Sequence, residues 1–312
     1  MTFAIHKVDV GIHPLRMTTT SLGILVMDST QSTVYLIDDY GIKTALTSLN
    51  FPVWARILNG KIYIADVEDK SVSVWDTSGK LLGKVNIYRP QMLKIYKGKI
   101  YVSSGKTLYE LSDDLRILKK WKFSSSSVYF YFDENKLIYL NYWQWDASPD
   151  VEIVDLNTGT IIERLELGLE RPLRFIKWKD YYVFLGYKTG DVVFVKNGEI
   201  LWKVNLPPFS YDMIALGDRI FISNLLKKGL YSLDPIKKTV EKIDLPYCIS
   251  DMAVKDSKII AAAIYDNLAL LLKDGEITGK CSCSYPVMVN FWNGYAVALC
   301  SSEGSVCFMK AW

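Results

Sequence analysis

The sequence predicts an all-β protein, a single eight-bladed β-propeller with four antiparallel strands in each blade. Three observations support this fold class. Two independent series of landmark residues repeat every 37 to 45 positions, each repeat holds four short strand-like segments, and a spare strand-like segment precedes the first repeat. Units of this length with four strands each are typical of propeller blades.

The first landmark series marks the start of each repeat, just before an apolar segment. It consists of Pro14, Pro52, Pro90, Ser127, Pro172, Ser210, Cys248 and Pro286, with spacings of 38, 38, 37, 45, 38, 38 and 38 residues. The second series consists of turn residues: Gly60, Gly98, Asn135, Asp180, Asp218, Asp256 and Gly294, with spacings of 38, 37, 45, 38, 38 and 38. Hairpin turns with positive φ select these residue types. Because both series share one irregularity, the repeat is genuine.

Each repeat contains four strand-like segments, which in the second repeat are 53–58, 61–65, 71–75 and 81–87. The last repeat has only three before Trp312, so we expect Phe3 to Val10 to supply its fourth strand. This pairing would protect two open sheet edges. The predicted single domain, 1–312, has blades at about 14–49, 52–87, 90–123, 127–167, 172–206, 210–245, 248–283 and 286–312 plus 1–10.

The composition suits a large β protein, since 50% of the residues are apolar and 13% are aromatic. The formal net charge is +3 without a run of basic residues, which disfavours nucleic-acid binding but leaves room for a local patch. No segment is apolar enough for a membrane span or a signal peptide, so we expect a cytoplasmic protein. Scarce Gln with abundant Lys, Ile and Tyr hints at a thermophilic source.

The five cysteines all lie in the last quarter of the chain. Their odd number, without a secretory signal, predicts free thiols in a reducing compartment. Cys281 and Cys283 point the same way if they lie on a strand, but no His or second Cys pair is near in sequence. We therefore expect no metal site.

Several segments resemble known propeller repeats. Residues 198–204 resemble the quinoprotein-type strand, and 154–160 and 231–235 resemble the strand and turn of quinoprotein-like and YVTN repeats. Trp75-Asp76 is a WD dipeptide. The chain thus resembles, in pattern, the β-propeller superfamily of quinoprotein-like, YVTN and WD40-like repeats. The resemblance implies the fold and no particular activity, because propellers host enzymes and scaffolds alike.

No catalytic motif stands out. The nucleophile elbow, the P-loop and the dinucleotide fingerprint are absent from the sequence, as is the polar and metal-binding set expected of a quinone enzyme. We therefore predict no catalytic residue, no metal and no cofactor.

The irregularity in the repeat is the most informative feature for function. The fourth repeat has about seven extra residues between its second and third strands, and this loop contains Tyr142, Trp143, Gln144, Trp145 and Asp146. Trp and Tyr are enriched in binding hot spots. Two interpretations stay open: the loop recognises a partner, or it folds back and caps its own blade.

In propellers the loops after the second and the fourth strands emerge on the same face. The resemblance therefore implies that Trp54, Arg89, Arg171 and Tyr211 share a face with the long loop, against a rim that includes Asp28 and Asp66. An ordinary solvated rim of mixed charge is the alternative.

The sequence favours a non-enzymatic scaffold that presents this face to a protein partner. The alternatives are a propeller hydrolase or lyase with its site at the mouth of the central channel, and a protein that binds a carbohydrate or small ligand. A cluster of carboxylates with one Arg or His on the first strands would favour the enzyme.

Overall fold

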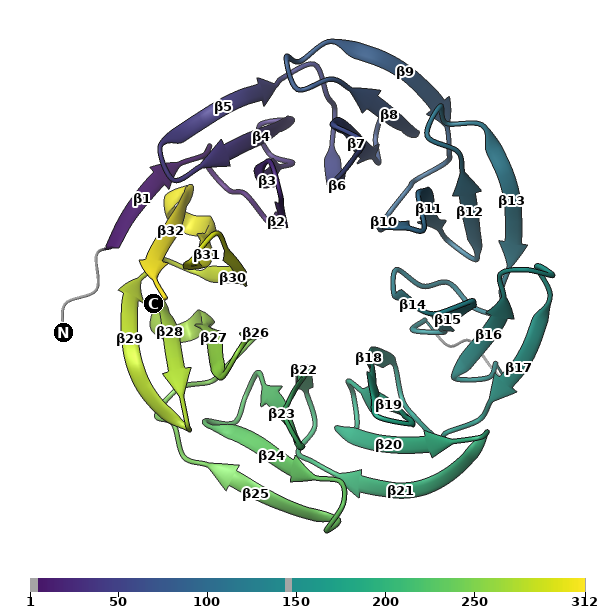
Figure 1. The fold of residues 1–312 in the computed structure, drawn as a ribbon, viewed down its shortest axis with the longest axis vertical. Coiled ribbons are helices and arrows are strands. Elements are labelled where there is room, and N and C mark those ends of the chain that lie inside the picture. The colour runs from purple at the N-terminus through teal and green to yellow at the C-terminus, as the bar shows by residue number, and fades with distance from the viewer. Residues whose placement is uncertain (1–4, 144–147, 312) are drawn as a thin grey trace. The chain divides into compact units, whose positions relative to one another are not determined.

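The computed structural model describes residues 5–143 and 148–311. These residues form eight four-stranded sheets, each built from strands that pair antiparallel (Figure 1). Seven sheets contain strands in chain order, and the eighth has the order β1-β32-β31-β30. The predicted fold class, an eight-bladed β-propeller, is confirmed.

The strands of the first four blades follow the predicted repeats. Blade 1 has β2 (Arg16–Thr20), β3 (Gly23–Asp28), β4 (Thr33–Asp38) and β5 (Gly41–Leu46). Blade 2 has β6 (Pro52–Leu58), β7 (Lys61–Asp66), β8 (Ser71–Trp75) and β9 (Leu81–Asn86). Blade 3 has β10 (Leu93–Tyr96), β11 (Lys99–Ser104), β12 (Thr107–Leu111) and β13 (Ile117–Lys122). Blade 4 has β14 (Phe130–Asp133), β15 (Lys136–Leu140), β16 (Val151–Asp155) and β17 (Ile161–Leu165).

The other four blades keep the same rhythm. Blade 5 has β18 (Pro172–Trp178), β19 (Tyr181–Gly186), β20 (Asp191–Lys196) and β21 (Glu199–Asn205). Blade 6 has β22 (Ser210–Leu216), β23 (Arg219–Asn224), β24 (Leu230–Asp234) and β25 (Thr239–Ile243). Blade 7 has β26 (Asp251–Lys255), β27 (Lys258–Ala263), β28 (Leu268–Lys273) and β29 (Glu276–Ser282). Blade 8 has β30 (Pro286–Trp292), β31 (Tyr295–Cys300), β32 (Ser305–Lys310) and β1 (Ile5–Asp9).

The chain divides into two compact units. Unit 1 comprises Met1–Ser104, Leu108–Lys120 and Ala253–Trp312, and unit 2 comprises Gly105–Thr107 and Trp121–Met252. Two 3-10 helices, Ile264–Asp266 and Ser301–Glu303, are the only helices among the described residues. Neither has the length or the apolar character that crossing a membrane requires.

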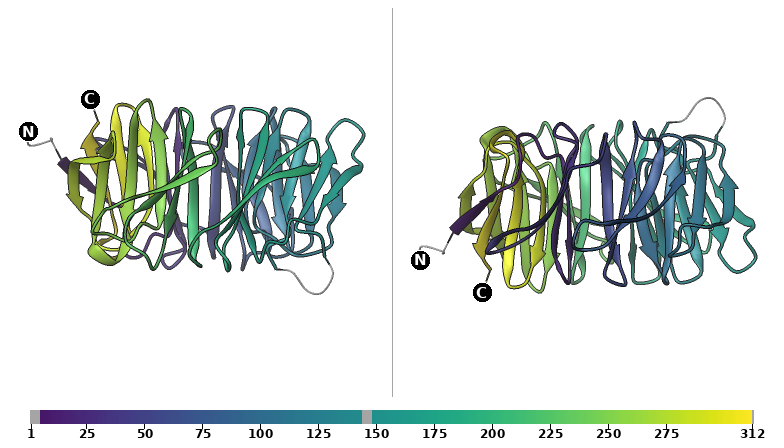
Figure 2. Two further views of the ribbon diagram at one scale, coloured as in Figure 1. Left: turned by 90° about the horizontal axis from the view of Figure 1, so that it is seen from below. Right: turned by 90° about the horizontal axis from the view of Figure 1, so that it is seen from above.

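The N-terminal strand completes blade 8. β1 pairs antiparallel with β32 from Ile5↔Met309 to Asp9↔Ser305, and the two ribbons lie side by side (Figures 1 and 2). Val8 and Val10 are buried in the cluster that contains Phe308. The predicted pairing of the first and last strands is confirmed.

Burial falls from the middle strands of a blade to its last strand. Every residue of β3 is buried, whereas most of β25 is exposed. The middle strands are therefore apolar on both faces, as in β27 with its Ile259-Ile260-Ala261 run, because they pack on both sides. In β9, the last strand of blade 2, exposed residues alternate with half-buried ones over most of its length.

A polar residue at the end of the second strand anchors the loop that enters several blades. Asp28 accepts a hydrogen bond from the Ile12 amide at 2.8 Å, and Asp66 accepts one from the Phe51 amide at 2.8 Å. Asn141 and Asn224 hold the equivalent loops of blades 4 and 6 through their amides. Asp28 and Asp66 are buried, so their carboxylates have a structural role in place of a solvated acidic rim.

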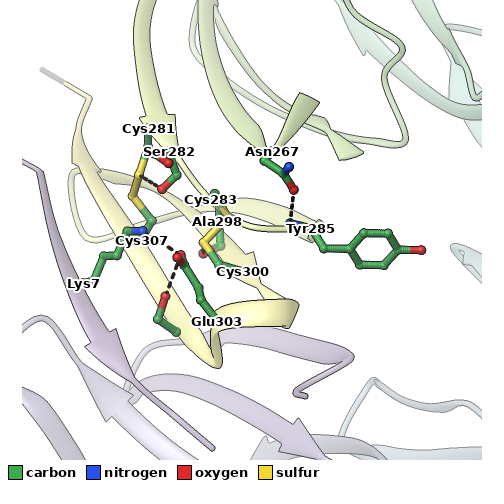
Figure 3. The surroundings of a disulfide bond; sticks show 11 residues. Lys7, Asn267, Cys281, Ser282, Cys283, Tyr285, Ala298, Cys300, Glu303 and Cys307 are labelled. Atoms are coloured by element: carbon green, nitrogen blue, oxygen red, sulfur yellow. Dashed lines mark hydrogen bonds and ion pairs between the residues drawn. A yellow bond between two sulfur atoms is a disulfide. The ribbon is translucent and has the colours of Figure 1, made fainter. Parts of the chain in front are cut away.

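The prediction of five free thiols is wrong. Cys281 is bonded to Cys307 and Cys283 to Cys300 (Figure 3). Cys248 is the one cysteine of the described chain outside a disulfide. The first pair joins β29 to β32, and the second joins the segment after β29 to the end of β31. Both disulfides therefore link blade 7 to blade 8 within unit 1. Cys281 on β29 and Cys283 just after it each meet a partner on the neighbouring blade, a pairing that sequence spacing does not reveal.

Candidate binding surface

The long loop of blade 4 is anchored at both described ends. The Trp143 amide donates to the Ser126 carbonyl at 3.1 Å, and Ser125 Oγ donates to the Trp143 carbonyl. At the other end, the Asn141 side chain donates to the Pro149 carbonyl at 2.8 Å. These contacts fix the positions of Tyr142 and Trp143. Gln144, Trp145 and Asp146, which the sequence also indicated, lie outside the described residues.

Arg171 joins Tyr142 and Trp143 in one group, here called the Arg171 cluster. Its guanidinium carbon lies 5.1 Å from the ring centre of Trp143 and 5.9 Å from that of Tyr142. The two aromatic rings meet edge to face at 5.0 Å, an arrangement that favours aromatic pairs. The Trp143 side chain is 43% exposed, whereas Tyr142 and Arg171 are partly buried beneath it. The structure thus brings together three of the predicted binding residues.

Electrostatics keep the Arg171 cluster cationic. Burial raises the pKa of Tyr142, and the nearby Tyr129 adds to the effect, so its hydroxyl stays neutral at ordinary pH. Arg171 also hydrogen-bonds the Tyr142 side chain. Among the described residues of this cluster, the guanidinium therefore carries the only charge.

Tyr211 belongs to a second group beside the first, the Arg174 cluster of Tyr129, Arg174 and Tyr211. The Arg174 guanidinium carbon lies 5.7 Å from the Tyr129 ring centre and 5.4 Å from that of Tyr211. Tyr129 in turn meets Tyr142 at 5.2 Å, which connects the two clusters.

Arg174 is committed to an internal ion pair. Its Nε lies 2.8 Å from Asp212 Oδ1, and the other Asp212 oxygen accepts the Met252 amide at 2.7 Å. Burial by itself lowers the pKa of Arg174, but Asp212 raises it well above the ordinary value. This pair links β18 to β22 and to the backbone of Met252, all within unit 2. The Arg174 cluster therefore holds the structure beneath the candidate surface, whereas the Arg171 cluster contributes the exposed Trp143 ring.

Trp54 and Arg89 lie in unit 1, apart from the Arg171 cluster in sequence and in unit. Trp54 is flanked by Arg16 and Arg56, whose guanidinium carbons lie 5.1 and 5.0 Å from its ring centre. Arg89 lies 6.0 Å from the Tyr88 ring centre. Arg89 and Arg171 both precede a proline and both have left-handed backbone, at φ 48° and 57°. Because this conformation recurs in two blades, we attribute it to the repeat.

Two further aromatic residues, Tyr187 and Phe209, extend the surface and were not among the predicted binding residues. The Tyr187 ring lies 6.0 Å from Tyr211 and 5.5 Å from Phe209, and the Tyr187 amide donates to the Arg171 carbonyl at 2.9 Å. Tyr187 follows the second strand of blade 5, the same loop position as Tyr142 in blade 4. Comparing loop positions between repeats could have found it.

A polar pocket of about 740 Å³ also lies in unit 2, lined in part by Asp133, Lys177 and Tyr182. Asp133 pairs with Lys177 at 2.8 Å and accepts the Tyr182 hydroxyl at 2.7 Å. Burial alone raises the pKa of Asp133, but these two partners lower it overall. Burial and Asp133 raise that of Tyr182. Neither group exchanges protons near neutral pH, so this network does not suit acid-base catalysis.

Cys283, Cys300 and Glu303 form the one group of possible metal ligands found among the described residues. The two sulfur atoms are bonded to each other (Figure 3). Because the thiolate is the metal-binding form of cysteine, the oxidised pair does not ligate a metal.

No protein-family model and no curated protein matches this chain. Solved structures match over nearly the full length. Sqt1 of Saccharomyces cerevisiae is 12% identical with a TM-score of 0.82, and 99% of each chain is covered. BBS1N, in a complex with ARL6DN, is 13% identical with a TM-score of 0.62, covering 99% of this chain and 96% of that one.

A streptogramin B lyase is 11% identical with a TM-score of 0.59, covering 98% of this chain and 97% of the lyase. These similar structures thus include a lyase as well as a protein seen in a complex. At such identities the likeness shows the fold alone. The chain therefore has the β-propeller fold that its repeat pattern predicts.

Proposed function

We propose that this protein is a non-enzymatic binding module that presents the Arg171 cluster to a protein partner. The observation that carries the proposal is the stack of Arg171 on Tyr142 and on Trp143, whose ring is 43% exposed. Trp, Tyr and Arg are the residues most enriched in interface hot spots. An exposed Trp held by anchored backbone loses little conformational entropy on binding, which favours affinity.

The supporting structure around the cluster agrees with this role. The internal Arg174–Asp212 pair and the Tyr129 ring hold the base of the surface in place. The similar structure of BBS1N, determined in a complex with ARL6DN, is a propeller-like chain bound to a protein. Tyr211, Gln144, Trp145 and Asp146 complete the proposed binding residues.

Replacing Trp143 with Ala should weaken partner binding strongly. Removing a hot-spot aromatic costs about 2 kcal/mol or more, which is about a thirtyfold loss of affinity. The tagged full chain, Trp143→Ala and Arg171→Ala would each be used to capture proteins from the source organism, with quantitative mass spectrometry of what is retained. We expect the same protein to be lost from both variants.

Tyr40→Ala is the matched control, because Tyr40 is 92% exposed and lies in a turn of blade 1. This variant should retain the partner at the wild-type level. Once the partner is known, isothermal titration measures its affinity for each variant. Equal affinity for wild type and Trp143→Ala would reject the cluster as the binding surface.

A further inference from the structure

A pocket of about 500 Å³ in unit 1, here called the Arg56 pocket, has the chemistry of a ligand site. It is lined by the first strands of blades 8, 1, 2 and 3, namely β30, β2, β6 and β10, which contact one another in that order. Small-molecule sites commonly have volumes of about 300–1,000 Å³. Its lining includes Thr18, Thr19, Arg56, Lys94 and Asn290.

Four of these residues occupy the same position of the repeat. Thr18, Arg56, Lys94 and Asn290 pair with Leu25, Tyr63, Tyr101 and Val297 on the second strands of their blades, in the same register. The equivalent residues in the other four repeats are Tyr131, Ile176, Ile214 and Ala253. Charged or amide side chains thus occupy this position in blades 8, 2 and 3, with Thr18 in blade 1, and in none of the other four blades. A general requirement of the fold would not produce that division.

Two threonine hydroxyls of the pocket act as hydrogen-bond acceptors. Arg56 donates to Thr18 Oγ1, and Asn290 Nδ2 donates to Thr19 Oγ1 at 3.0 Å. The Phe291 amide donates to Asn290 Oδ1 at 2.8 Å, which fixes the orientation of that side-chain amide. Each hydroxyl has thus accepted a bond from a group that only donates. Its own hydrogen has no acceptor among the described residues.

The charged side chains that line the described part of the pocket are all positive. Arg56 and Lys94 line it, and none of the described lining residues is a carboxylate. No described carboxylate lies within ion-pair distance of Arg56, in contrast to the Arg174–Asp212 pair. Burial without a compensating negative charge lowers the pKa of Arg56 to about 10.

We propose that the Arg56 pocket binds a small molecule through an oxyanion group, a phosphate or a carboxylate. The guanidinium of Arg56 is the principal contact, because its planar fork of donors matches both groups. The hydroxyls of Thr18 and Thr19 supply neutral donors, and Lys94 supplies the second positive charge. This site is independent of the proposed protein-binding surface, which lies in unit 2.

Isothermal titration of the full chain with inorganic phosphate and with citrate tests the proposal. In sodium chloride of matched ionic strength, we expect saturable binding of one anion with a Kd below about 1 mM. The stronger of the two titrations identifies the phosphate or the carboxylate as the favoured group. Absence of saturable binding for both anions would overturn the proposal.

Variants assign the binding to the pocket. Arg56→Met should weaken the binding of the favoured anion by about tenfold or more. Thr18→Val should weaken it by about threefold, because a neutral hydrogen-bond donor contributes less than a charged one. Arg56→Lys keeps the charge without the fork and should bind with intermediate affinity. Arg116→Met is the matched control, because Arg116 is 77% exposed and pairs with Asp114 outside the pocket. Equal losses in Arg56→Met and Arg116→Met would contradict the assignment.

Urea unfolding separates a binding role from a structural one. Because burial lowers the pKa of Arg56 below its unfolded value, the protonated guanidinium opposes folding below about pH 10, and this opposition is lost as the pH rises further. Without added anion, Arg56→Met should therefore unfold at the same or a higher urea concentration than wild type. The favoured anion should stabilise wild type more than the variant at the same anion concentration. A less stable variant that the anion stabilises as much as wild type would refute the site.

Discussion

Removal of residues 1–10 is expected to lower the free energy of unfolding by several kcal/mol. The truncation removes β1, exposes the edge of β32 and takes away Val8 and Val10, which are 8% and 0% exposed. Burying one Val contributes about 1.5–3 kcal/mol, and domains as a whole are stable by only about 5–15 kcal/mol. The ion pair of Lys7 with Glu303, at 2.6 Å, is exposed enough that its loss adds little.

Thermal and urea unfolding followed by circular dichroism measure this effect. Val10→Ala should reproduce part of the destabilisation, since its side chain is fully buried. Ile5→Ala is the control on the same strand, because Ile5 is 45% exposed, and it should unfold like wild type. An unchanged melting temperature after truncation would show that β1 does not hold blade 8 together.

Reduction of the two disulfides should produce the other large loss of stability. The bridges close loops with sequence separations of 26 and 17 residues. Loop-closure entropy predicts about 3 kcal/mol for each bridge. We expect a strong reductant to lower the urea midpoint markedly, and the double variants Cys281→Ser/Cys307→Ser and Cys283→Ser/Cys300→Ser each to show part of that effect.

Thiol counting tests the pairing itself. The denatured, unreduced protein should expose one reactive thiol, that of Cys248, and full reduction should expose all five. Cys248→Ser is the control and should leave the urea midpoint unchanged. Five reactive thiols before reduction would contradict the disulfides.

The two disulfides bear on the cellular compartment in which the protein is expected. The prediction of a cytoplasmic protein rested on the lack of a recognisable signal peptide and membrane span, and the free thiols expected in such a compartment are replaced in the structure by two disulfides. Disulfides persist in oxidising compartments and also in intracellular proteins of hyperthermophiles. The cytoplasmic location and the thermophilic source both stay predictions, and the count of thiols in protein isolated from its source bears on both.

The repeat spacing was sufficient to predict the blades because every blade satisfies the same constraints. Gly60, Asn135 and their equivalents close the same turn, so the strands around them fall into register. Cys283 and Cys300 escaped prediction because their contact depends on how one blade packs on the next. That packing leaves no periodic signal in the sequence.

For the candidate surface, too, some features were predictable from the repeat and others were not. The prediction placed Arg171 on the face of the long loop, and the structure stacks it on Tyr142 and Trp143. Trp54 lies between Arg16 and Arg56 in unit 1, and its place on the same face stays a prediction. The aromatic ring that a given arginine contacts depends on the side-chain geometry between neighbouring blades, which the repeat spacing does not specify. The Arg56 pocket was missed because its four polar residues are each unremarkable until they are aligned by repeat position.

Hydrogen exchange of the full chain with and without its captured partner tests the central claim most directly. We expect slower amide exchange in the peptides that contain Tyr142, Trp143, Arg171 and Tyr187 when the partner is bound than in the protein alone. Peptides around Arg56 and Lys94 should be unaffected by the partner and protected by the favoured anion. Partner-dependent protection that omits the Arg171 cluster would contradict the account.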